Sequence, residues 1–160
     1  MNFQEIFNSF LEHEKELKVV SVASCDKSSK PNSAHKMLVD VHEPNVILFL
    51  DYNHTQTYGN MQANPQLSVS FMDDAGFAGY RLTGTAEVLK SGSKEFEEAR
   101  KSWNKKLISY EADRIIRRVQ GQYSTRNAEN KLPPDFVIVK FIAKEASTIM
   151  PDRVLRAKAT

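Results

Sequence analysis

The chain has 160 residues and a formal net charge of +2, with 41% hydrophobic and 26% charged residues. These values are ordinary for a globular protein with a sizeable core, so we treat residues 1–160 as a single domain. No apolar run approaches the roughly 20 residues that a membrane-spanning helix needs, and we expect no membrane partner. The first residues lack the basic start and apolar stretch of a signal peptide, which favours a cytoplasmic protein.

Several kinds of chemistry lack the residues that they require. The single cysteine, Cys25, excludes an intramolecular disulfide framework and a cysteine-rich zinc site. The four histidines form neither a helical i, i+4 pair nor a pair with cysteine, so no metal site is expected. The net charge is too small to indicate nucleic-acid binding, and the basic residues of segment 105–118 are more typical of a solvated helix face.

The first half of the chain reads as a helix followed by closely spaced strands. Apolar residues recur at i, i+3, i+4 and i+7 from Phe3, which predicts an amphipathic helix that ends near Lys18. Gly84 predicts a bulge or a close backbone approach within the fifth strand. A short helix is expected at 55–64, between the third and fourth strands. The five predicted strands are 19–25, 31–41, 46–50 (apolar throughout and therefore buried on both faces), 67–72 and 81–88.

The second half is predicted to begin with helices. Ser93 is a candidate cap for a helix whose buried stripe consists of Phe96, Ala99, Trp103 and Leu107. A second helix is expected at 111–119, a polar loop at 121–134 and a last strand at 136–143. The predicted class is mainly β with helices (α+β): a small six-stranded antiparallel β-barrel with an N-terminal helix and a helical insertion at about 93–134, before the last strand.

Ordered sequence pieces between Leu17 and Leu89 indicate a family. These pieces are Val20–Ser24, Asp26, Lys30–Pro31, Val46–Leu50, Thr55–Thr57, Asn60, Ala63–Pro65, Leu67–Phe71 and Tyr80–Glu87. In this order and spacing the segment resembles the pyridoxamine 5′-phosphate oxidase-like split barrels that bind FMN. The resemblance implies FMN as cofactor and a homodimer with the cofactor at its two-fold interface. Gln56 departs from the family pattern, because many relatives have a Lys or Arg there that helps to hold the FMN phosphate.

The resemblance also implies where the cofactor residues lie, namely on the second strand, at the end of the third strand, on the loop after it and on the fifth strand. The candidates are His35, Lys36, Met37, Phe49, Leu50, Asp51, Thr55, Gln56, Thr57, Asn60 and Arg81. Lys36 and the Thr55–Thr57 helix start would bind the phosphate, and the third-strand end would border the flavin ring.

Each of these candidates has an ordinary structural alternative. Lys36 fits a solvent-facing strand residue, and His35 fits a structural histidine. Phe49 and Leu50 fit plain core residues, while Thr55 and Asn60 fit a helix cap and a loop brace. Arg81 either reaches the cofactor or bridges two subunits.

Two functions remain open from the sequence. The first is an FMN-dependent oxidoreductase that acts on a small-molecule substrate or electron donor. Oxidation of vitamin B6 itself is not expected, because the segment Met150–Arg156 lacks the Arg-rich signature that the resemblance associates with that reaction. The second is a non-catalytic split barrel that binds FMN, haem or another ligand, or that has lost its cofactor, and Gln56 favours this alternative. Whether the protein is an enzyme is left open.

Overall fold

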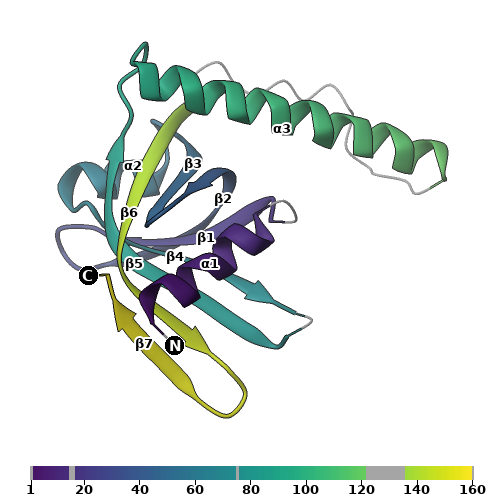
Figure 1. Ribbon diagram of the computed structural model, residues 1–160. Helices are drawn as coiled ribbons and strands as arrows, with labels where there is room; N and C mark the ends of the chain where they lie inside the picture. Colours follow the sequence, from purple (N-terminus) through teal and green to yellow (C-terminus); the bar gives the residue numbers. More distant parts are fainter. Residues whose placement is uncertain (1, 15–16, 75, 122–135, 160) are drawn as a thin grey trace.

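The chain folds around one antiparallel sheet that closes on itself (Figure 1). The computed structural model describes residues 2–14, 17–74, 76–121 and 136–159. Its elements are α1 (Phe3–His13), β1 (Val19–Cys25), β2 (Pro31–His42), β3 (Val46–Tyr52), α2 (Gln56–Ala63), β4 (Gln66–Asp73), β5 (Ala78–Val88), α3 (Lys94–Val119), β6 (Phe136–Ile149) and β7 (Val154–Lys158).

Strand β6 closes the barrel and also extends it. The strand order is β3-β2-β1-β4-β5-β6-β7, and β3 pairs in addition with β6, so β1 to β6 form a closed six-stranded barrel. The first half of β6 pairs with β3 over residues 136–142, and its second half pairs with β7 over residues 145–149. The predicted six-stranded antiparallel barrel is confirmed, and β7 is an additional strand.

The barrel interior holds the main core, and α1 contributes to it. Asn2 caps α1 by accepting a hydrogen bond from the Glu5 backbone N–H, while the Glu5 side chain accepts one from the Asn2 N–H. The apolar face of α1, with Ile6, Phe7 and Phe10, is fully buried among the inward side chains of the strands. Burial of these aromatic and aliphatic groups anchors the helix to the barrel.

Helix α3 covers a second core on the outside of β2, β3 and β6. Phe96, Ala99 and Trp103 are buried there, with Leu107 partly buried, as the sequence predicted. Their partners include Leu48 and Leu50 of β3. The residues that alternate with these two in the strand, Ile47 and Phe49, point into the barrel. Strand β3 is therefore buried on both faces, which explains its continuous apolar sequence.

The later half of α3 projects beyond the barrel in Figure 1. Its exposed apolar residues are Ile108, Ile115, Ile116 and Val119. Among the described helices, none is long and apolar enough to cross a membrane.

Several boundaries differ from the prediction. Helix α1 ends at His13, earlier than the predicted end near Lys18. Segment 94–119 is one helix rather than two, because it contains neither glycine nor proline, the residues that break helices most strongly. Strand β6 continues to Ile149. The loop predicted at 121–134 lies outside the described residues except for Gly121.

Two local predictions are confirmed. The Ser93 hydroxyl accepts a hydrogen bond from the Phe96 N–H at 3.2 Å and so caps α3. The register of β5 against β6 shifts between Thr83 and Gly84, and a Cβ atom at Gly84 would collide with the Ile142 carbonyl oxygen. Gly84 is therefore required by the close approach of two backbones.

Candidate functional site

Lys36 and Asp51 form a buried ion pair inside the barrel. The β2–β3 register pairs Leu38 with Phe49, and Lys36 and Asp51 lie two residues further along on the same inward face. The Lys36 Nζ to Asp51 Oδ1 distance is 2.6 Å, and both side chains are almost fully buried. The same Oδ1 accepts hydrogen bonds from the Thr55 hydroxyl at 2.8 Å and the Tyr52 N–H at 2.7 Å. The Lys36 charge is thus neutralised in the interior.

This carboxylate also affects its neighbour. The pKa of Tyr52 is raised above the ordinary value for tyrosine. The larger cause is burial of the phenol, and the smaller cause is the negative charge of Asp51. The second oxygen of Asp51, Oδ2, has no hydrogen-bond partner within the described part of the chain. The end of β3 therefore carries a buried carboxylate whose hydrogen bonds all go to one oxygen, Oδ1.

Helix α2 is held to the barrel by a second polar network. The Gln56 amide donates to Asn60 Oδ1 at 2.7 Å, and the Asn60 amide donates to the Ser24 hydroxyl at 3.0 Å. The Asn32 amide donates to Ser24 at 3.3 Å and to Thr57 Oγ1 at 3.2 Å. The Thr57 and Asn60 side chains are buried, so they brace α2 against β1 and β2.

The outer face of the sheet presents a different set of residues. Strand pairing aligns one residue from each of six strands in a single row: His35, Ser21, Ser70, Arg81, Ser147 and Arg156. Within this row the Ser21 hydroxyl lies 3.0 Å from His35 Nδ1, and Arg81 Nε donates to the Ser147 hydroxyl at 3.2 Å. We call this the polar row.

Two further rows flank the polar row, two residues away along each strand. On one side lies a row of mostly small and charged residues: Ser33, Ala23, Ser68, Thr83, Glu145 and Lys158. On the other side lie exposed apolar residues: Val19 (40% exposed), Met72 (67%), Ile149 (52%) and Val154 (54%). We refer to the latter four as the apolar row, and to the three rows together as the outer face.

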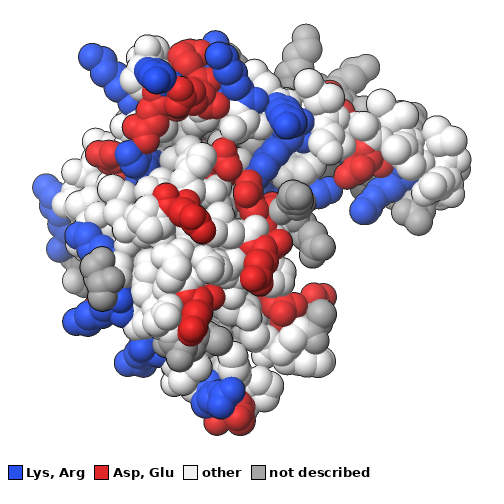
Figure 2. Space-filling view, viewed as in Figure 1, with Lys and Arg blue, Asp and Glu red and all other residues white. Residues whose placement is uncertain are grey.

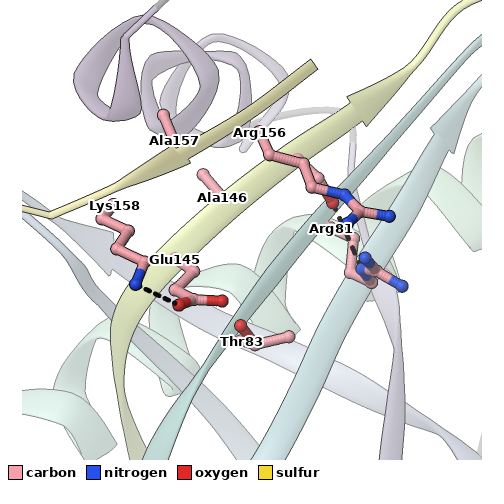
Figure 3. A pocket seen from close by; sticks show the side chains of 8 residues that line it. Arg81, Thr83, Glu145, Ala146, Arg156, Ala157 and Lys158 are labelled. Atoms are coloured by element: carbon pink, nitrogen blue, oxygen red, sulfur yellow. Dashed lines mark hydrogen bonds and ion pairs between the residues drawn. The ribbon is translucent and has the colours of Figure 1, made fainter. Parts of the chain in front are cut away.

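A groove of about 470 Å³ crosses the end of the outer face, over β5, β6 and β7. Its charged lining consists of Arg81, Arg156, Lys158 and Glu145. Figure 3 shows the guanidinium groups of Arg81 and Arg156 pointing to the same side, away from the Glu145–Lys158 pair.

The structure distributes the candidate residues from the sequence over four places. His35 and Arg81 are exposed on the outside of the sheet. Met37 and Leu50 pack against the core under α3, while Lys36, Phe49 and Asp51 face the barrel interior. The remaining candidates lie at or within α2: Thr55, Gln56, Thr57 and Asn60. The interior group and the α2 group are each joined by the hydrogen bonds described above. His35 and Arg81 share the polar row but are separated by three strand spacings, about 14 Å.

Sequence reasoning missed Ser21, Ser70, Ser147 and Arg156. The period-two alternation of β4 already put Ser68 and Ser70 on the other face from their apolar neighbours, so part of the polar row could have been predicted from the sequence. Arg156 was not, because β7 was not predicted.

The charges along α3 are mixed. Figure 2 shows Lys and Arg side chains interleaved with Asp and Glu along this helix, and the face in view carries no broad basic surface. Lys106 forms an ion pair with Glu14 at 2.8 Å, and Arg100 forms one with Glu97 at 2.6 Å.

The family model for pyridoxamine 5′-phosphate oxidase matches residues 4–150, which is most of the chain. The chain belongs to the pyridoxamine 5′-phosphate oxidase family. Membership in this family agrees with the split barrel and the closing role of β6. No curated protein matched the sequence.

Solved structures of the pyridoxamine 5′-phosphate oxidase fold resemble the chain over nearly its whole length. A Clostridium acetobutylicum protein related to general stress protein 26 has a TM-score of 0.67 and 17% identity, with 97% of this chain and 95% of that chain covered. A Nostoc punctiforme pyridoxamine 5′-phosphate oxidase-related, FMN-binding protein has a TM-score of 0.62 and 12% identity, with 98% and 89% covered.

A third similar structure is that of a protein that binds a different ligand, haem. The heme binding protein from Mycobacterium smegmatis has a TM-score of 0.67 and 13% identity, with 99% of this chain but only 58% of that chain covered. At these identities the likeness establishes the fold alone.

Proposed function

We propose that this protein binds FMN on the outer face and acts as an oxidoreductase on a small molecule. The observation that carries the proposal is the polar row, in which hydroxyl, imidazole and guanidinium groups from six strands share one surface. Family membership and the FMN-binding protein among the similar structures support the choice of FMN. The flavin, when bound, supplies electron or hydride transfer.

The outer face fits both parts of FMN. Small side chains such as Ser21, Ala23 and Ser68 leave the sheet flat enough for an aromatic ring to approach the backbone, and the serine hydroxyls and His35 offer hydrogen bonds to its rim. The phosphate requires cations or several N–H donors.

Lys36 does not supply that charge in this structure, because Asp51 neutralises it. Other donors in this region are the backbone N–H groups of Gln56 and Thr57 in the first turn of α2, whereas the Tyr58 N–H donates to Thr55 and the Gln56 amide already donates to Asn60. We therefore assign the phosphate to the start of α2 or to the basic end of the outer face.

An absorbance spectrum of the purified protein tests this function. A flavin spectrum, with FMN identified by mass spectrometry of the released ligand, is the expected result. If the protein is isolated without cofactor, titration with FMN and with riboflavin follows, and FMN should bind more tightly because of its phosphate. Failure to bind either flavin would contradict the proposal.

A haem-binding protein is the second candidate, and one observation favours it. His35 presents an exposed imidazole on the outer face, where it is positioned by Ser21, and imidazole is a common axial ligand of haem iron. The same spectrum separates the two candidates, because bound haem gives a Soret band. Loss of that band in His35→Ala, with retention in His42→Ala, would assign the ligand to His35.

A further inference from the structure

The groove across β5, β6 and β7 has an uncompensated positive charge. Glu145 lies 3.6 Å from Lys158, so these two residues form an ion pair. Arg81 and Arg156 have no carboxylate partner among the described residues, although both are exposed and line the same groove. The local charge is therefore close to +2, which is the charge that a phosphate group neutralises.

The strand register explains why these two arginines converge. Arg81 of β5 pairs with Ser147 of β6, and Ser147 pairs with Arg156 of β7. The two arginines are thus two strand spacings apart, about 10 Å, with a serine between them. An oxyanion located above Ser147 lies within reach of both guanidinium groups.

Ser147 adds a hydroxyl group to the lining of the groove. Its side chain is nearly buried, and its oxygen accepts the Arg81 Nε–H at 3.2 Å. With that lone pair engaged, the hydroxyl hydrogen remains to be donated into the groove. Thr83 offers a second hydroxyl from the neighbouring row.

We propose that this groove is a binding site for a phosphate monoester group, held by Arg81 and Arg156 with Ser147 at its floor. Guanidinium groups suit this ligand because their planar N–H pairs match phosphate oxygens in a bidentate manner. The phosphate can belong to FMN or to a separate small molecule. The site does not depend on FMN being the cofactor.

The first experiment titrates inorganic phosphate at constant ionic strength and follows the ¹H–¹⁵N spectrum, including arginine side-chain signals. Groove residues should shift in a saturable manner. Arg81→Gln and Arg156→Gln should each weaken binding roughly three- to tenfold, as for the loss of one partly exposed charged contact. Arg153→Gln is the matched control, because Arg153 is an exposed arginine of the same hairpin that lies beside Asp152 rather than in the groove.

A second variant moves the affinity in the opposite direction. Glu145→Gln frees the Lys158 ammonium and removes a negative charge from the groove, so phosphate should bind roughly two- to fivefold more tightly. Equal phosphate affinity in Arg81→Gln, Arg156→Gln and Arg153→Gln would overturn the proposal. So would saturable shifts that lie outside the groove.

The source of the phosphate is decided by comparing phenyl phosphate, FMN and riboflavin on the same variants. If FMN and phenyl phosphate both depend on Arg81 and Arg156 while riboflavin does not, the FMN phosphate occupies the groove. If inorganic and phenyl phosphate bind there but no flavin binds to the protein, the groove stands and the FMN function fails. If FMN binds and neither arginine affects any phosphate ligand, the FMN function stands and the groove proposal fails.

Discussion

At the scale of single residues, burial decides what a charge can do. Lys36 and Gln56 were candidates for the same phosphate, yet Lys36 is inside the barrel and Gln56 is on its surface. A strand alternates its faces, so one position separates an interior lysine from an outer histidine at position 35. A substitution of Lys36 should therefore change stability, whereas a substitution of Gln56 should change the affinity for FMN.

Lys36→Met should destabilise the fold strongly. It leaves the Asp51 carboxylate buried without its cation, which in proteins generally costs about 3–5 kcal/mol. Chemical unfolding measures the loss. Adding Asp51→Asn should recover most of it, because the amide oxygen still accepts from Thr55 and Tyr52 while the buried charge is gone. Unchanged stability in Lys36→Met would show that Asp51 does not depend on this pair.

Gln56→Lys should tighten FMN by roughly two- to fivefold, because it adds one exposed cation at the start of α2. The gain should shrink at high salt and be absent for riboflavin. Gln62→Lys, which adds the same charge later on the same helix, is the control. Equal effects of the two substitutions would remove Gln56 from the phosphate site.

At the scale of elements, the sequence predicted those that bury a continuous apolar surface and missed β7, which is short and little buried. The alternation of β4 and β5, the apolar run of β3 and the stripe of α3 each reflect a surface that must be buried, and each is present. Strand β7 has five residues of alternating exposure at the edge of the sheet, so little burial constrains its sequence. For that reason the sequence could not predict that Arg156 lies two strands away from Arg81, with Ser147 between them.

Gly84→Ala should cost about 1–3 kcal/mol, because its methyl group meets the backbone of Ile142 and the strands cannot separate without losing ladder hydrogen bonds. Gly59→Ala is the matched control. Gly59 lies within α2 with nothing near its missing Cβ, and the substitution should stabilise the helix by up to about 1 kcal/mol. Unfolding midpoints of the two variants with opposite signs are expected, and a neutral Gly84→Ala would contradict the close approach.

At the scale of the whole molecule, the apolar row leaves one face of the sheet incompletely covered. Exposed apolar residues from β1, β4, β6 and β7 lie beside the polar row. A second copy of the chain packed there would bury them and enclose a ligand between two outer faces, which is the arrangement of a C2 homodimer.

Light scattering at micromolar concentration should therefore report twice the 18.2 kDa of the chain. Met72→Lys with Ile149→Lys should shift the protein to monomer, because two charges would be buried at the contact. Ile115→Lys on the projecting half of α3 is the control and should remain dimeric. A monomer in the unmodified protein would exclude this assembly.

Strand β7 is an edge strand, so the backbone N–H and C=O groups on one of its sides have no partner strand among the described residues. It pairs with β6 on one side, and within the described residues no strand pairs with its other side. An exposed edge strand can pair with a strand of another molecule unless charged side chains prevent it. We expect the charges of Arg156 and Lys158 to oppose such pairing, so a variant that replaced both with valine should lose solubility as well as any ligand held in the groove.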